Sequence, residues 1–247
     1  ALVVAVLLPT VARAEWTVNS LERQPAGDGA IEYRRYSLGQ PDSGKEIELH
    51  LALFSPKKAA LRVIDQPESD RRLAEVMVAE KSFAGVNGGY FDPNGAPVGL
   101  LISGGETIAP FKKARLLSGV LAAGEGRIEI FRANEFPRKR AWREAVQCGP
   151  FLVDHGKSVV GLDDTRSARR TFVLTTTDGR VALGSCAPVT LAHLAEMLPA
   201  LAPLKVARAI NLDGGSSSAF WCRTNEKTIS ISEFKSVRDF VAIVPTK

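Results

Sequence analysis

The sequence predicts an α+β fold, a single domain of mixed, largely antiparallel β-sheet with a few packed helices. Residues 46–54 alternate apolar and polar side chains, which is the period of a half-buried strand. Similar short runs recur along the chain between turns rich in glycine, proline, asparagine and aspartate. Apolar side chains repeat at helical spacing in two segments, which begin near residues 67 and 190. Many short strands with two helices are typical of an α+β domain.

The individual elements follow from these runs. The expected strands are residues 31–36, 46–54, 61–64, 83–87, 98–102, 116–122, 127–131, 151–153, 171–177, 181–184, 208–212, a strand near 229, and 240–244. In residues 46–54 one face is aliphatic, and His50 lies on the other face, which we expect to contact solvent. Asp178-Gly179 predicts a hairpin turn. The first helix should open at residues 67–70, and the second should be capped by Thr190.

The N-terminal segment predicts export. Residues 1–14 hold a short apolar run followed by Ala12-Arg13-Ala14, the small-residue pattern of a signal-peptide cleavage site. The run is too short to span a bilayer. We therefore expect a signal peptide at 1–14, a mature domain at 15–247, no stable membrane span after cleavage, and a secreted or periplasmic location.

Composition narrows the classes of partner. The formal net charge of +5 is mildly basic, and the chain lacks the dense Lys/Arg stripe of a nucleic-acid-binding protein, so no nucleic acid partner is expected. Three cysteines allow at most one disulfide, and Cys186 with Cys222 is the pair weakly favoured, because each lies near a strand end. Cysteines without close histidine partners argue against a zinc site. Asp163-Asp164 could bind a cation or form a solvated turn.

The most informative segment runs from Asn211 to Ser218. Ile210 and Leu212 should face a core, so that Asn211 and Asp213 point to the other side of the strand. A glycine pair follows, which leaves backbone N–H groups accessible, and then come three hydroxyl side chains. The residues after Asp213 are Gly214, Gly215, Ser216, Ser217 and Ser218. Such a loop can hold a sugar or phosphate oxygen, although a plain turn with Asp213 capping its own loop is the alternative.

A second segment has the same design. The strand at residues 83–87 ends on Asn87, and a glycine pair and aromatic residues follow. The residues after Asn87 are Gly88, Gly89, Tyr90, Phe91 and Asp92. Functional groups often lie on loops at the ends of rigid strands. We expect the two loops to meet and to surround one bound anion.

Other motifs point to chemistry but lack their partners. Residues 215–219 loosely resemble the nucleophile elbow of α/β-hydrolases, in which the acid and then the histidine follow the serine. All three histidines, at 50, 155 and 193, precede Ser217 here. A serine-type acyl hydrolase using Ser217 therefore stays an alternative that needs a different fold. Residues 55–58 match a Ser-x-x-Lys spacing without a Lys-Thr-Gly partner, and no phosphate-binding or dinucleotide fingerprint is present.

Four segments in order give the chain a resemblance to the phosphodiester glycosidase family. They are Asn87-Gly88-Gly89-Tyr90-Phe91 with Pro97-Val98-Gly99-Leu100, Gly149-Pro150-Phe151-Leu152-Val153, Arg170-Thr171, and Asn211-Leu212-Asp213-Gly214-Gly215 with the serines. Together they span about residues 83–221. One departure is Ser216, where the family often has a third glycine, and a serine there narrows the conformational freedom of the loop.

The resemblance implies hydrolysis of a sugar attached through phosphate. Arg170 would bind phosphate oxygens with its planar fork, and Asp213 would serve as general base, nucleophile or cation ligand. Asn87 is the third residue placed in catalysis. Asp92 is the nearest candidate for a second carboxyl group, which glycoside hydrolysis generally uses. The expected substrate-binding residues are Gly88, Gly89, Tyr90, Asp92, Gly149, Gly214, Gly215, Ser216 and Ser217.

The sequence thus predicts an exported hydrolase that cleaves a sugar from a glycosyl phosphodiester, either a GlcNAc-1-phosphodiester or an envelope polysaccharide. It indicates no required cofactor, is compatible with a divalent cation, and names no metal ligands. A non-catalytic glycan-binding envelope domain is the main alternative, because it would keep the same glycine loops. The basic connector at residues 132–143 either concentrates an anionic substrate or is a solvated loop.

Overall fold

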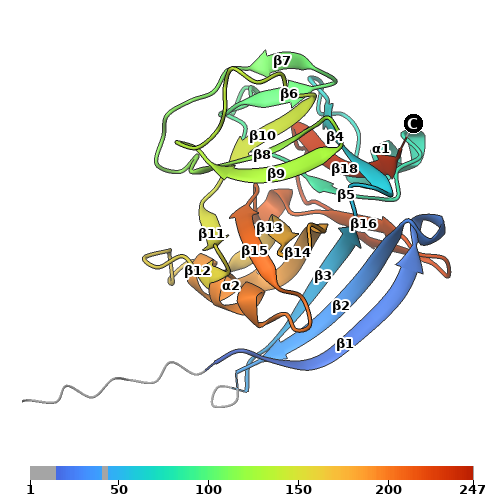
Figure 1. Ribbon diagram of the computed structural model, residues 1–247, viewed down its shortest axis with the longest axis vertical. Helices are drawn as coiled ribbons and strands as arrows, with labels where there is room; N and C mark the ends of the chain where they lie inside the picture. Colours follow the sequence, from blue (N-terminus) through green and yellow to red (C-terminus); the bar gives the residue numbers. More distant parts are fainter. Residues whose placement is uncertain (1–14, 41–43, 247) are drawn as a thin grey trace, which may run out of the picture.

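The computed structural model describes residues 15–40 and 44–246, so the predicted signal peptide lies outside the described residues. Its largest sheet has eight antiparallel strands in the order β1-β2-β3-β14-β13-β15-β11-β12 (Figure 1). In chain order these strands are β1 (Thr17–Ala26), β2 (Ile31–Gly39), β3 (Glu46–Phe54), β11 (Phe151–Asp154), β12 (Lys157–Ser158), β13 (Ala168–Thr176), β14 (Val181–Val189) and β15 (Val206–Asn211).

Two five-stranded sheets pack beside it. The first has the order β7-β6-β10-β8-β9, and the second has the order β17-β16-β5-β18-β4. The strands of the first are β6 (Leu101–Ser103), β7 (Glu106–Ala109), β8 (Gly119–Gly124), β9 (Arg127–Arg132) and β10 (Glu144–Cys148). The strands of the second are β4 (Ala59–Asp65), β5 (Ala84–Asn87), β16 (Phe220–Arg223), β17 (Thr228–Ile231) and β18 (Asp239–Pro245). The antiparallel pairing and few helices confirm the predicted fold class.

Both α-helices are short. The second, α2 (Leu191–Met197), begins as predicted, because Thr190 Oγ1 accepts the backbone N–H of His193 at 3.2 Å. The first, α1 (Leu73–Ala79), begins later than residues 67–70, where we expected it. Ser69 has a φ of +49°, which breaks a helix there, and Glu75 instead accepts the backbone N–H of Arg72 at 2.8 Å. Among the described helices none is long and apolar enough to cross a bilayer.

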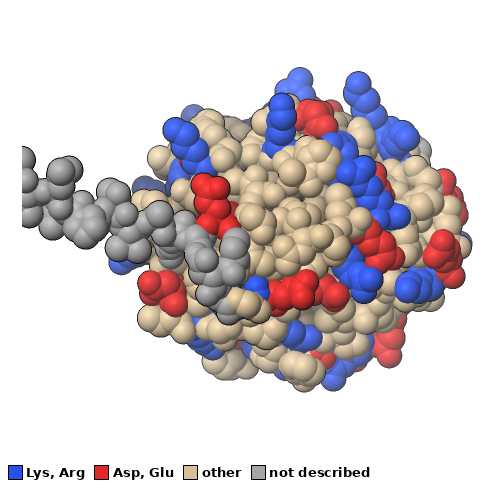
Figure 2. Space-filling view, turned by 90° about the horizontal axis from the view of Figure 1, so that it is seen from below, with Lys and Arg blue, Asp and Glu red and all other residues tan. Residues whose placement is uncertain are grey.

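Short 3₁₀ segments complete the described secondary structure. They are η1 (Gly27–Gly29), η2 (Leu198–Ala200) and η3 (Gly215–Ser217). Of these, η3 follows the Asp213 loop, so the hydroxyl run that we singled out forms a tight turn before β16. Lysine, arginine and acidic side chains are interspersed around an uncharged centre on the face shown in Figure 2.

His50 is buried, which corrects our expectation that it faces solvent. Its side chain belongs to β3, and its Nδ1 lies 2.8 Å from the hydroxyl of Tyr33. Its ring centroid lies 5.8 Å from that of Phe220 in β16. The neighbouring sheet therefore covers the second face of β3, and Ala52 is buried with His50. Burial lowers the pKa of His50, against the opposing effect of Glu48.

The cysteines form no disulfide, so the weakly favoured Cys186–Cys222 pair is wrong. All three thiols are free and buried. Cys186 lies in β14 of the large sheet, whereas Cys222 lies in β16 of another sheet, and the two belong to different hydrophobic clusters. Burial raises the pKa of Cys186 and Cys222 to about 12, which keeps these thiols protonated and unreactive near neutral pH.

The largest hydrophobic cluster joins all three sheets and fixes where their strand ends meet. It includes Val86 from β5, Val146 from β10, Ile210 from β15 and Val241 from β18, all essentially buried. In Figure 1 β10 lies in the upper sheet, and β5, β15 and β18 lie between that sheet and the long strands β1 to β3. The polar ends of β5, β13, β15 and β18 emerge from this core together.

Candidate functional site

The loops after β5 and β15 meet, as we expected from their common design. The backbone N–H of Asp213 donates to the carbonyl of Gly88 at 3.0 Å. The side-chain amide of Asn87 donates to the carbonyl of Asp213 at 2.8 Å. These two hydrogen bonds fasten the glycine pair of one loop to the aspartate of the other, across more than a hundred residues of sequence.

Asn87 lies beneath this junction and is fully buried. Its Oδ1 accepts the hydroxyl of Thr171 at 2.7 Å and the backbone N–H of Ala219 at 3.0 Å. One amide therefore joins the end of β5, the strand β13, the Asp213 loop and the start of β16. Its buried position makes Asn87 a positioning residue that holds the Asp213 backbone.

Asp213 is the half-buried carboxyl group at the junction. Its Oδ1 accepts the backbone N–H of Gly214 at 2.9 Å. Burial raises the pKa of Asp213 above its usual range, against the opposing effects of the Ser217 hydroxyl, the Gly214 amide and the Lys235 ammonium group. The Ser217 Oγ approaches the carboxyl group without forming a hydrogen bond of normal geometry. A carboxyl group in such surroundings is suited to proton transfer.

Asp239, which no sequence motif predicts, lies behind the glycine pair. This buried residue begins β18, and its Oδ1 accepts the backbone N–H of Gly89 at 2.7 Å. Its own carbonyl accepts the N–H of Gly88 at 2.9 Å. Burial raises the pKa of Asp239 to about 7, aided by the charges of Asp65 and Asp213 and opposed by Gly89 and Arg238. Its signal in the sequence is limited to a single acid at the start of an apolar strand.

The Asp239 carboxyl group leaves no room for a side chain at Gly88. A Cβ atom at Gly88 would lie 1.8 Å from Asp239 Oδ1, a distance that forces either the loop or the carboxyl group to move. We expect Gly88→Ala to lower the free energy of unfolding by about 2–4 kcal/mol, because a buried hydrogen-bonded group would be displaced. Urea unfolding measures this loss. The matched control is Gly124→Ala in β8, where the nearest atom lies at 3.5 Å, and an equal loss there would contradict the account.

Arg170, predicted to bind phosphate, is buried and mainly contacts backbone. Its Nε donates to the carbonyl of Val189 at 2.9 Å, and its Nη2 donates to the carbonyl of Arg166 at 2.6 Å. Its Nη1 lies on the side of Gly214, 3.9 Å from the position a Cβ would take there. Burial lowers the pKa of Arg170, yet an arginine stays charged near neutral pH. The arginine therefore brings its Nη1 nitrogen and a positive charge to the Asp213 loop.

Tyr90 and Gly149 form the wall beside the junction. The Tyr90 hydroxyl donates to the carbonyl of Gly149 at 2.5 Å, and Asn211 Nδ2 donates to the same carbonyl at 3.1 Å. Burial raises the pKa of Tyr90, so its phenol stays protonated. These bonds hold the start of β11 against the two glycine loops.

The other predicted residues divide into two groups. Gly89, Gly214, Gly215, Ser216 and Ser217 all lie in the joined loops, and Gly215 has a φ of +64°, which glycine adopts without strain. Asp92 does not join them, because its Oδ1 accepts the N–H groups of Asn94 and Ala96 at 2.8 and 3.0 Å and closes its own turn.

Some of the buried side-chain atoms that have no hydrogen-bond partner within the described residues belong to the Asp213 loop and its neighbours. Within residues 15–40 and 44–246, the buried Oγ atoms of Ser217 and Ser218 and the Oδ1 of Asn211 have no partner, and neither do Nε and Nη2 of Arg169. Native proteins satisfy nearly all buried polar groups, so each of these atoms needs an explanation. A polar ligand that enters this site would supply the missing partners.

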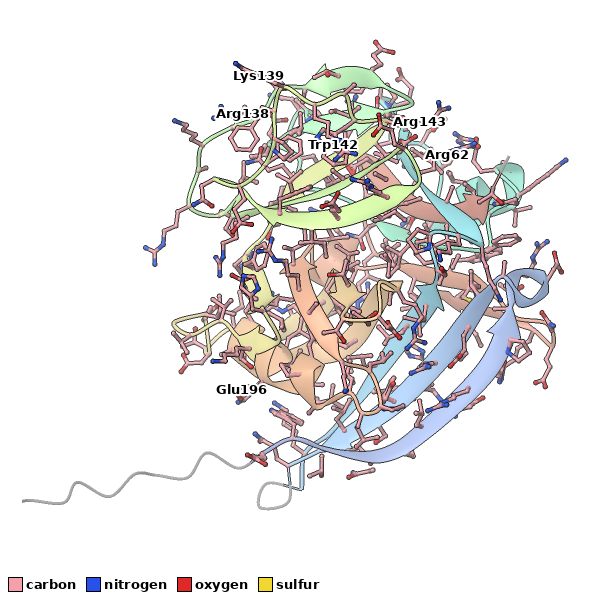
Figure 3. The ribbon with its side chains drawn as sticks, in the orientation of Figure 1. Arg62, Arg138, Lys139, Trp142, Arg143 and Glu196 are labelled. Carbon is pink, nitrogen blue, oxygen red and sulfur yellow. The ribbon has the colours of Figure 1, made fainter. Side chains whose placement is uncertain are left out.

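The basic connector at residues 132–143 lies on the outer side of the upper sheet. Figure 3 shows Arg138 and Lys139 at the top of the molecule. The guanidinium of Arg138 lies 4.9 Å from the ring centroid of Phe111, and that of Arg140 lies 4.4 Å from the ring of Trp142. Arg140 also pairs with Glu125 at 3.0 Å. These contacts favour the solvated-loop interpretation.

Candidate metal ligands are not grouped in the described part of the chain. No set of three or more His, Cys, Asp or Glu side chains there is placed to hold a metal ion. Asp163, which could have bound a cation with Asp164, uses its Oδ1 to accept the backbone N–H and hydroxyl of Thr165 at 2.9 and 2.7 Å. This arrangement is an exposed turn.

Comparison with solved structures supports the fold. The catalytic domain of zebrafish N-acetylglucosamine-1-phosphodiester α-N-acetylglucosaminidase, auto-inhibited by its pro-peptide, matches with a TM-score of 0.64 and 17% identity, over 92% of this chain and 88% of that one. A hypothetical protein from Synechocystis matches with a TM-score of 0.63 and 14% identity, over 88% of this chain and 62% of that one, so this chain spans under two thirds of its length. A Burkholderia pseudomallei protein that is predicted to be exported matches with a TM-score of 0.59 and 14% identity, over 82% and 75%.

Sequence comparison supplies the family. No curated protein sequence matches the chain. The family model described as phosphodiester glycosidase matches residues 80–244, which is more than half of the chain and includes the whole of the junction between the two glycine loops. The protein belongs to the phosphodiester glycosidase family.

Proposed function

We propose that the protein hydrolyses a glycosyl phosphodiester at the junction of the two glycine loops, with Asp213 as the catalytic carboxyl group. Membership of the family supports hydrolysis of a sugar phosphodiester. The observation that carries the proposal for this chain is the half-buried carboxyl group of Asp213, whose pKa is raised and which lies among buried polar atoms that have no partner. A site of this kind combines a proton acceptor with groups that can bind sugar hydroxyls and phosphate oxygens.

The reaction follows from the chemistry of the groups present. Asp213 as carboxylate accepts a proton from water while the water oxygen bonds to the anomeric carbon of the sugar. The bond between that carbon and the phosphate oxygen breaks, and the phosphate leaves with the electron pair as a phosphomonoester. Phosphate is a good leaving group, so a second carboxyl group contributes less than it does for an ordinary glycoside. Burial makes the Asp213 carboxylate a stronger base than an exposed one.

Negative charge on the departing phosphate is stabilised from the Asp213 loop. The Nη1 nitrogen and charge of Arg170 lie on the side of Gly214. The backbone N–H of Gly215 adds a further donor of the kind that stabilises developing charge in a fixed site. Asn87, Tyr90 and Gly149 hold these loops together.

Arg170→Ala should lower kcat/KM by about 10–100-fold on a GlcNAc-1-phosphodiester. It should also lower the melting temperature, because the carbonyls of Val189 and Arg166 lose charge-assisted hydrogen bonds worth about 1.5–3 kcal/mol. Kinetics well below the melting temperature separate the two effects. The matched control is Arg208→Ala, an arginine paired with Asp154 and Glu135 outside the joined loops. A folded Arg170→Ala protein with unchanged kcat/KM would remove Arg170 from the reaction.

The direct test of the proposal is turnover. Purified protein should release free N-acetylglucosamine from an α-GlcNAc-1-phosphodiester, and Ser217→Ala should retain most of that activity. The Ser217 side chain is fully buried, and its Oγ has no base as hydrogen-bond partner in the described structure. Binding of the diester without turnover would instead identify a glycan-binding domain.

The cellular location and the domain organisation belong to the same proposal. We place the protein in the secreted or periplasmic space as a single domain over residues 15–247. The apolar start of the sequence and the predicted export of a structural relative support this location. The natural substrate would then be a sugar phosphodiester of the cell envelope or of an exported polysaccharide.

A further inference from the structure

Arg169 lies next to Arg170 in β13 and has an unusual environment. Its Nη1 donates to the carbonyl of Ser232 at 3.0 Å, while its Nε and Nη2 are shielded from solvent and have no partner among the described residues. Burial lowers the pKa of Arg169, and the nearby charge of Glu233 opposes this effect without forming an ion pair. Glu233 is itself engaged, because its Oε1 accepts the backbone N–H of Leu73 at 2.8 Å.

The two unpartnered nitrogens form one edge of the guanidinium group. Nε and Nη2 donate in parallel, which is the geometry that binds two oxygens of a phosphate or carboxylate at once. Leaving such donors buried and unpaired is costly, and native proteins rarely do so without a reason. Arg170 cannot offer the same edge, since its Nε and Nη2 already donate to the carbonyls of Val189 and Arg166.

The backbone of Arg169 adjoins the Asp213 loop. The carbonyl of Arg169 is 3.2 Å from the position a Cβ would take at Gly214. The segment that contacts the Arg169 side chain is fastened to the same loop, because the backbone N–H groups of Phe234 and Lys235 donate to the carbonyl of Ser216 at 2.7 and 3.3 Å. Lys235 adds a second positive charge close enough to act on Asp213.

Phe234 covers the guanidinium group. Its ring centroid lies 4.1 Å from Arg169 Cζ, yet its side chain is 76% exposed to solvent. An exposed aromatic ring stacked on an arginine is held weakly, since exposed cation–π contacts contribute little. The ring can therefore rotate at small cost and widen the approach of an anion to the guanidinium group.

We propose that Arg169 is an anion-binding residue of this site, whose Nε–Nη2 edge binds a phosphoryl group and whose removable cover is Phe234. The proposal deepens the proposed function, on which it rests for the source of the ligand, by identifying the residue that recognises the phosphate. The ligand class is a phosphomonoester or phosphodiester of a sugar. Arg170 supports the loop from below, and Arg169 provides the two-point contact.

The test measures binding and needs no turnover. Inorganic phosphate and glucose 6-phosphate are titrated into the full protein by calorimetry, beside Arg169→Gln and Phe234→Ala. Arg169→Gln should weaken binding of both probes by about tenfold or more, the size expected for loss of a charge-assisted contact. Phe234→Ala should tighten binding by about two- to fivefold, because no ring has to be displaced. The control Arg127→Gln removes an equal charge from β9 and should leave both affinities unchanged.

The outcomes separate this inference from the proposed function. Equal affinity in Arg169→Gln and the wild-type protein would overturn the anion site, even if the diester is hydrolysed. Weaker binding in Phe234→Ala would overturn the role of the ring as a cover, and since this side chain is exposed, the variant should fold normally. Phosphate binding that depends on Arg169, in a protein without turnover, would instead contradict the enzymatic proposal alone.

Discussion

Asp213→Asn should lower kcat for a glycosyl phosphodiester by about 10²–10⁴-fold, the contribution typical of a positioned general base. Asparagine keeps the shape of the side chain and can still accept the N–H of Gly214, so the loop should keep its conformation. The variant loses only the ability to take a proton from water. Steady-state kinetics of the wild-type and variant proteins measure the effect.

The pH dependence gives an independent check on the same residue. In the wild-type protein kcat/KM should rise with pH as Asp213 loses its proton, and this rise should lie above the usual range of an aspartate, because burial raises its pKa. The matched control is Asp92→Asn, whose carboxyl group closes its own turn and should leave kcat within about twofold. A full retention of activity in Asp213→Asn would contradict the assignment.

Asp239→Asn should remove a large part of the pH dependence of stability. Because the folded-state pKa of Asp239 is about 7, the folded protein binds this proton more tightly than the unfolded chain does. Stability therefore falls as pH rises from the unfolded value of about 4 through the folded value. In the variant this position has no proton to lose. The difference in the free energy of unfolding between the two proteins should therefore change by about 3 kcal/mol between about pH 5 and pH 8, and Asp239→Asn should gain stability relative to the wild type at the higher pH.

Urea unfolding at the two pH values measures this difference, and comparing the two proteins cancels the titration of their shared groups. Asp28→Asn is the control, because it removes one carboxyl group from a highly exposed side chain. Parallel pH profiles for the wild type and Asp239→Asn would show that the carboxyl group titrates normally. Asp239 would then be a charged carboxylate in the folded protein, and Gly89 would donate its hydrogen bond to that carboxylate.

The strands that the sequence predicted are those in which local pattern and tertiary packing agree. In β3 the alternation was clear, and β2 and β14 pair with it on either side. By contrast, β10 (Glu144–Cys148) was not predicted, because it carries the polar residues Glu144 and Gln147 into the core. Glu144 Oε2 accepts the N–H of Val63 at 2.9 Å, a partner more than eighty residues distant. No local pattern could have shown that this buried carboxyl group has a hydrogen-bond partner.

The same distinction between local pattern and tertiary packing applies to the residues of the site. The meeting of the Asn87 and Asp213 loops could be expected, because glycine pairs at strand ends share one design. The backbone contacts of Arg170 and the part played by Asp239 could not, because both depend on which main-chain groups face them in the folded protein. Arg170 is next to Arg169 in sequence, and the register of β13 against β14 shifts between Ala168 and Arg170, so strand alternation does not tell where each side chain points. Only the structure shows that Arg170 donates its Nε and Nη2 hydrogen bonds to backbone carbonyls, whereas the same atoms of Arg169 have no partner among the described residues.

The most direct test of the account is the position of bond cleavage, followed with ¹⁸O-labelled water. If water attacks the anomeric carbon, as we propose for Asp213, mass spectrometry should find the label in the released sugar, and the phosphomonoester should stay unlabelled. Label in the phosphate would mean that water attacks phosphorus, and would contradict a glycosidase mechanism at this site.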